Sequence, residues 1–99
     1  MIYVLFYEYV PDIVTKRQPH RAKHLELLQG LFNRGALVMA GAWANPVDGA
    51  GLVFRADDDQ IVKSFVECDP YVVNGLVKRW RIREWTVVIG NPEAGITPS

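Results

Sequence analysis

The chain has 99 residues, of which 49% are hydrophobic, and its 11 Lys and Arg residues balance 11 Asp and Glu residues. This length suits one domain with a real core. A net charge of zero argues against nucleic-acid binding or an anionic membrane surface as partner, because both need surplus positive charge. No apolar run reaches the roughly 18 residues of a membrane span, and no signal segment is visible. The single cysteine, Cys68, excludes an internal disulfide. These features together predict a cytoplasmic protein.

The first half of the chain reads as a strand, a helix and a second strand. Residues 2–9 are β-branched, aromatic and apolar on both alternations, which is typical of a strand buried on both faces. Pro19 suits the first turn of a helix over residues 19–34, whose leucines recur at the helical period. Gly35 suits a left-handed cap, and residues 36–43 then predict the second strand.

The second half repeats the order strand, helix, strand. Turn chemistry at residues 45–49 predicts a hairpin into a third strand over residues 52–56. Aspartates at 57–59 cap a second helix over residues 58–68. The Asp69-Pro70 step then opens a short helical turn, and residues 77–89 form the last strand with a bend near Glu84-Trp85.

This order, β-α-β-β-α-β, predicts an α+β, ferredoxin-like domain over residues 1–90: a four-stranded antiparallel sheet with two helices on one face. Residues 91–99 predict a flexible C-terminal tail. The strands are apolar on both alternations, so the second sheet face also needs a cover. A second copy related by two-fold symmetry is the simplest cover, and we therefore expect a homodimer through the sheet face, a dimeric α+β barrel.

His24 and Asp69 are the residues most able to carry chemistry. His24 lies four residues before Leu28, on the inward half of its helix, and a histidine there can shuttle a proton near neutral pH. Asp69 can orient the imidazole by accepting from one ring nitrogen. Spacing alone leaves two interpretations open. The residues form an acid–base pair, or His24 is a satisfied core-edge histidine and Asp69 only a helix cap.

Several short runs, in this order and spacing, resemble the YCII-related (YciI-like) family over nearly the whole chain, to about Val88. The runs are Arg21-Ala22-Lys23-His24-Leu25, Gly35-Ala36-Leu37, Ala40-Gly41-Ala42, and Asp69-Pro70-Tyr71 with Gly75. One departure is visible: relatives often carry a proline after the Ala-Gly pair, whereas this chain has Ala42 and then Trp43, which would narrow a pocket.

The resemblance implies a ferredoxin-like dimeric α+β barrel, in agreement with the pattern above. It also implies an active-site pair formed by a helix-one histidine and the aspartate of the Asp-Pro-Tyr step, here His24 and Asp69. Many family members have no assigned reaction, and at least one relative is a dehydrochlorinase of chlorinated aromatics. The wider barrel superfamily includes muconolactone isomerases and small monooxygenases.

Three further residues are candidates for substrate binding. Arg21, one turn before His24, suits a substrate carboxylate or phenolate, although without the resemblance a surface arginine paired with an acid explains it better. Tyr71 and Trp43 suit pocket walls, because they adjoin Asp69 and the end of the second strand. His20 and His24 make at most half a metal site, so we expect no metal. No nucleotide, flavin or haem motif is present, so we expect no cofactor, and Cys68 suits a passive buried thiol.

Two functions remain open from the sequence. The first is a small cofactor-free enzyme, an isomerase or a lyase of dehydrohalogenase type, in which His24 and Asp69 move a proton on a small cyclic or aromatic acid. The second is a non-catalytic dimer that binds a small ligand or serves as an accessory to another enzyme.

Overall fold

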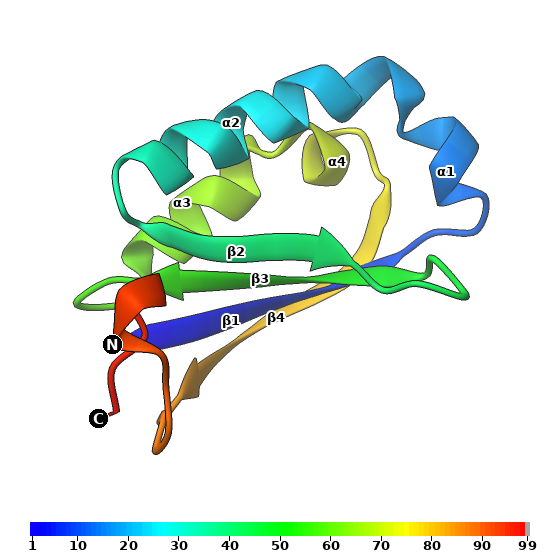
Figure 1. The fold of residues 1–99 in the computed structure, drawn as a ribbon. Helices are drawn as coiled ribbons and strands as arrows, with labels where there is room; N and C mark the ends of the chain where they lie inside the picture. The colour runs from blue at the N-terminus through cyan, green and yellow to red at the C-terminus, as the bar shows by residue number, and fades with distance from the viewer. Residues whose placement is uncertain (99) are drawn as a thin grey trace.

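The computed structural model describes residues 1–98, which form one sheet with helices packed on one side (Figure 1). The strands are β1 (Ile2–Tyr9), β2 (Leu37–Ala42), β3 (Gly49–Arg55) and β4 (Val77–Trp85). The helices are α1 (Ile13–Lys16), α2 (Arg21–Asn33), α3 (Gln60–Cys68) and α4 (Pro70–Val73), with single 3-10 turns η1 (Gln18–His20) and η2 (Pro92–Ala94). The α+β, ferredoxin-like order of elements is as the sequence predicts.

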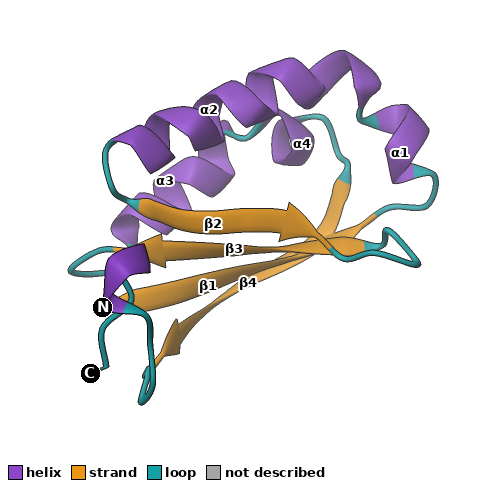
Figure 2. Ribbon diagram, viewed as in Figure 1, coloured by secondary structure: helices purple, strands orange, loops and turns teal. Residues whose placement is uncertain are grey.

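The four strands form an antiparallel sheet in the order β2-β3-β1-β4. The helices α2, α3 and α4 lie on one face, and no α-helix of the described residues lies on the other (Figure 2). The edge strands are β2 and β4. The apolar strand β1 is a central strand, and most of its side chains are buried. No helix of the described residues is long and apolar enough to cross a bilayer.

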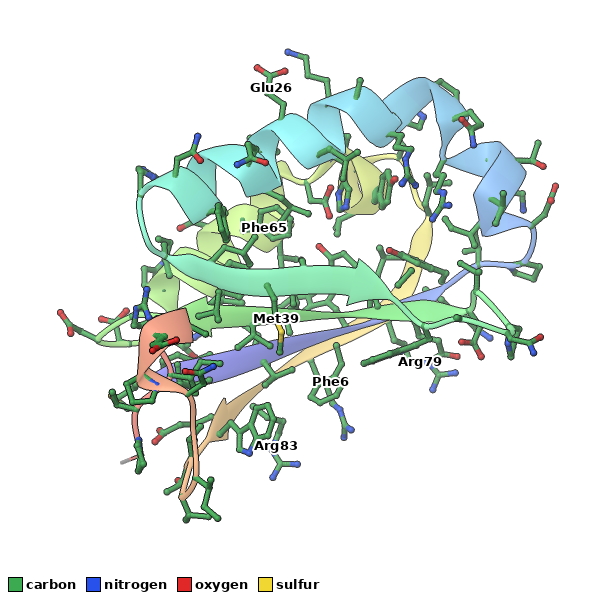
Figure 3. All side chains as sticks on the ribbon, in the orientation of Figure 1. Phe6, Glu26, Met39, Phe65, Arg79 and Arg83 are labelled. Atoms are coloured by element: carbon green, nitrogen blue, oxygen red, sulfur yellow. The ribbon has the colours of Figure 1, made fainter. Side chains whose placement is uncertain are left out.

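Alternation along β1 divides the core into two layers. Leu5 and Tyr7 face the helices and belong to the main cluster with Phe65 of α3, whereas Val4 belongs to a smaller cluster on the other face. Figure 3 shows this division: Phe65 lies between the helices and the sheet, and Phe6 projects from the opposite side. We call the side without helices the open face.

The open face is covered in part by the chain that follows β4. Val87 is buried there against Ile2, and Ile96 packs on the same cluster. The guanidinium of Arg55 donates to the carbonyl of Gly95, which ties this segment to β3. Residues 91–98 of the expected flexible tail thus include a short turn and specific contacts, and Ser99 lies outside the described residues.

Some element boundaries differ from the sequence-based ones. The long helix begins at Arg21, because Pro19 belongs to the separate turn η1, and the segment before that turn contains the short helix α1. The strand β3 begins at Gly49, three residues earlier than expected, because the hairpin pairing continues to the turn. The last strand ends at Trp85 rather than at residue 89.

Candidate active site

Asp69 occupies the junction between α3 and α4, and the local sequence explains why. Its backbone leaves the helical region, with ψ at 119°, and Pro70 begins the next helix without an N–H to satisfy. The carboxylate caps α4 by accepting from the backbone N–H of Tyr71 at 3.1 Å. Because the side chain is 0% exposed, this charge needs further partners inside the protein.

His24 of α2 supplies the second partner. Its Nδ1 lies 2.7 Å from Oδ1 of Asp69, and the histidine is itself only 6% exposed. The ring of Tyr71 stacks on the imidazole, with centroids 3.7 Å apart and planes within 5° of parallel. The two side chains that the sequence pairs across 45 residues therefore meet, and the stacked ring fixes the plane of the imidazole.

Tyr7 of β1 is the third partner, and the sequence reasoning missed its role. Its hydroxyl donates to Oδ2 of Asp69 at 2.7 Å, so both carboxylate oxygens are occupied. Burial, and then the nearby carboxylate, raise the pKa of the Tyr7 phenol, so it remains a donor at every physiological pH. The alternation of β1 places Tyr7 on the helix side, but nothing local indicates a partner 62 residues away.

The arrangement assigns the ring nitrogens of His24 different roles. A carboxylate only accepts hydrogen bonds, so the neutral imidazole carries its proton on Nδ1. The remaining nitrogen, Nε2, then has a free lone pair on the other edge of the ring. This geometry is that of a general base held in one tautomer by a buried acid.

A cavity of about 170 Å³ adjoins the pair. His24 and Tyr71 line it from one side, and Leu28 and Leu52 give it apolar walls from α2 and β3. An apolar cavity of about 150 Å³ accepts benzene, so this one has room for a single six-membered ring. His24 therefore borders a space of the size of a small cyclic molecule.

Only two of the three residues expected to bind substrate lie at this cavity. Arg21 and Tyr71 line the cavity with His24, whereas Trp43 does not. Trp43 lies across the open face, where a side chain on Gly51 would come within 2.7 Å of the indole. Alternation explains the difference, because Ala42 faces the helices and its neighbour therefore faces away.

Other ligand chemistry is sparse in the part of the chain that the structure describes. Residues 1–98 contain no group of three or more His, Cys, Asp or Glu side chains that could hold a metal ion. Cys68, expected to be buried, is exposed at the end of α3, because the next position, Asp69, takes the inward place. Arg17, outside every sequence-based expectation, joins Arg21 in lining the cavity.

Tyr9, which lines the cavity, makes the stability of the protein depend on pH in the alkaline range. Burial, and then the neighbouring Tyr71 and Asp69, raise its pKa to about 12. Between pH 10 and 12 the native protein therefore keeps a proton that the unfolded chain has lost, so stability falls as the pH rises through this window. One such group contributes a slope of about 1.4 kcal/mol per pH unit.

We expect Tyr9→Phe to flatten the alkaline fall in stability by up to that slope. The measurement is urea unfolding of both proteins at several pH values from neutral to 12. Since no hydrogen bond of the Tyr9 hydroxyl is present among the described residues, the variant should match the wild type at neutral pH. Parallel curves above pH 10 would contradict the assigned pKa.

Comparison with known proteins identifies the family of this chain. The model of the YCII-related domain matches residues 1–86. A solved structure with a TM-score of 0.73 and 24% identity, covering 86% of this chain and 93% of its own, is 5-chloro-2-hydroxyhydroquinone dehydrochlorinase from Burkholderia phenoliruptrix AC1100, in complex with 2,5-dihydroxybenzoquinone. None of the curated proteins compared with the chain is a match. With the domain matched over most of its length, the chain belongs to the YCII-related domain family.

Proposed function

We propose that this protein is a small enzyme that uses His24 as a proton acceptor and donor, oriented by Asp69, on a small cyclic or aromatic acid. The observation that carries the proposal is the buried 2.7 Å contact between Nδ1 of His24 and Oδ1 of Asp69, beside a cavity of ring size. A carboxylate with all its hydrogen bonds satisfied stabilises the imidazolium that forms when Nε2 takes a proton.

Two reaction types need only one such base. In an elimination, Nε2 takes a proton from the substrate, the electron pair left behind becomes a new π bond, and a halide leaves with the electrons of its bond to the neighbouring carbon. In an isomerisation, the same nitrogen returns the proton to a different atom of the ring. Both steps need one titratable group of fixed position, which the stacking of Tyr71 on the imidazole supplies.

The dehydrochlorinase of similar fold suggests the first substrate to test. We expect the protein to release chloride from 5-chloro-2-hydroxyhydroquinone, or to exchange a ring proton of a related cyclic acid for deuterium in heavy water. His24→Gln should lower that rate by about a hundredfold to ten-thousandfold. His20→Gln is the matched control, because His20 lies one turn earlier and does not line the cavity.

A His24→Gln variant as active as the wild type would overturn the enzyme proposal. A protein that binds ring acids in this cavity, with no turnover of any kind, would instead be the non-catalytic binding module that the sequence also allows. The test therefore separates the two functions by measuring binding and turnover on the same variants.

The proposed active form is a homodimer closed through the open face. Large apolar side chains remain exposed there, including Met39 at 54% and Trp85 at 52%, around a hollow of about 710 Å³. Exposed apolar area of this kind favours association. A two-fold axis would bring the open faces of two copies together. Because the net charge of each chain is zero, the two copies do not repel each other through their net charge. The guanidinium of Arg81 stands 4.9 Å from the ring centre of Phe6, a cation–π contact that partners this charge within its own chain.

Light scattering at micromolar concentration tests the dimer. We expect twice the chain mass of 11.2 kDa for the wild type and a single chain mass for Met39→Glu, because the substitution buries a charge at the interface. Val73→Glu on α4, also an exposed apolar position at 66%, should remain dimeric. A monomeric wild type would refute the proposal.

A further inference from the structure

We propose that Arg17 and Arg21 together form an anion subsite at the mouth of the cavity, which selects a single-ring ligand carrying a carboxylate or phenolate oxygen. This inference deepens and rests on the proposed function, because it names the chemical class that the site of His24 would bind. Its distinctive part is Arg17, which comes from the segment between α1 and η1 rather than from the long helix.

The two guanidiniums reach the same space from successive turns. Arg17 directly follows the short helix α1 and keeps helical backbone angles, and Arg21 begins α2 four residues later, after the turn η1. Arg21 and His24, three residues apart on α2, lie on one face of that helix. All three line the cavity of about 170 Å³.

Neither arginine is neutralised by the protein. The ion pairs of residues 1–98 join His24 to Asp69, Lys63 to Asp59, and Lys78 and Arg79 to Glu8, so none involves Arg17 or Arg21. The carboxylate of Asp69, within the same site, already accepts from Tyr7, His24 and Tyr71.

Arg17 also carries an unused donor. Its Nε is buried from solvent and has no hydrogen-bond partner among the described residues. A buried donor without a partner is costly, and a ligand oxygen that turns this side chain toward the cavity and accepts from Nε would recover that cost. A second observation is electrostatic: the charges of both arginines lower the pKa values of Tyr9 and Tyr71, against the larger raising effect of burial. Positive potential therefore extends over the cavity that these phenols line.

The remaining walls define the rest of the ligand. Leu25, Leu28 and Leu52 present apolar surface, and Ala50 leaves the floor shallow. With room for a single ring, the ligand places its anionic oxygen on the arginines and its ring on the leucines, within reach of His24. Charge-assisted contacts to guanidinium are stronger than neutral ones, so the subsite favours the ionised acid over a neutral isostere.

Benzoate and benzamide are the matched probes, because they share shape and differ in charge at neutral pH. We expect the wild type to bind benzoate about tenfold to a hundredfold more tightly than benzamide in an NMR titration. Arg17→Gln should weaken benzoate binding about tenfold and leave benzamide unchanged, and Arg21→Gln should do the same. Arg34→Gln, an exposed arginine at the far end of α2, is the control and should change neither.

A second readout does not depend on a variant that folds. In the wild type, benzoate should shift the Nε–H resonance of Arg17, and benzamide should not. Equal affinities for the two probes, or benzoate binding unaffected by Arg17→Gln and no shift at its Nε–H, would overturn the inference. Because both measurements are made without turnover, they fail or succeed separately from the His24→Gln activity test. Benzoate binding that requires Arg17 in a protein without turnover would leave the subsite intact and refute only the enzyme.

Discussion

Replacing Asp69 with alanine is expected to lower the free energy of unfolding by about 3 to 5 kcal/mol. The substitution removes the acceptor for three donors at once: the Tyr7 hydroxyl, Nδ1 of His24 and the backbone N–H of Tyr71. All lie in a region closed to water, where Asp69 itself is 0% exposed. The helix cap of α4 is lost as well, which by itself costs about 1 kcal/mol.

Urea unfolding measures this loss against a matched control. Asp57→Ala removes an exposed carboxylate with no hydrogen bond or ion pair among the described residues, and should change stability by no more than about 0.5 kcal/mol. Since small domains are stable by only about 5 to 15 kcal/mol, the Asp69 variant should lose much of its stability. A variant as stable as the Asp57 control would show that the buried network is not formed in solution.

Replacing Asp69 with asparagine is expected to act on turnover more than on folding. The amide keeps the volume and can still accept from one neighbour, so the loss of stability should be smaller than for alanine. An amide nitrogen turned toward Nδ1 of His24 would donate to it, and the ring would then carry its proton on Nε2, where it cannot act as a base. We expect kcat/KM to fall by about a hundredfold to ten-thousandfold, as for His24→Gln.

A double variant tests whether Asp69 acts on turnover through His24. If Asp69 acts only through the histidine, Asp69→Asn in a His24→Gln background should cost almost nothing further, because residues that work as a unit are not additive. Steady-state rates on the substrate identified by chloride release or deuterium exchange measure both effects. A full additional loss in the double variant would mean that Asp69 serves the reaction by another route.

The sequence predicts the fold because its elements rest on strong local signals, and it favours the central pair only through the family resemblance. The period of α2, the buried character of β1 and the Asp69-Pro70 step are each legible within a few residues. Topology then brings the helices onto one face. Because α2 and the junction of α3 and α4 lie in the same helix layer, residues 24 and 69 can make contact. The resemblance identifies these two positions.

The rest of the site depends on long-range contacts that no local pattern records. Tyr7 looks like any inward aromatic of an apolar strand, and its partner is set by how α3 and α4 sit on the sheet. Arg17 follows a four-residue helix, which is too short for periodicity to detect. Trp43 was chosen by its nearness to a strand end, whereas strand alternation sends it to the open face, where Gly49 and Gly51 leave room for the indole.

The tautomer of His24 tests the central claim most directly. Nitrogen NMR of the imidazole, recorded at a pH where the ring is neutral, distinguishes a proton on Nδ1 from one on Nε2. We expect the Nδ1–H form in the wild type, with Nε2 unprotonated, and a loss of that preference in Asp69→Asn. A wild-type ring protonated on Nε2 would contradict it, because the nitrogen assigned as the base would then have no lone pair to offer.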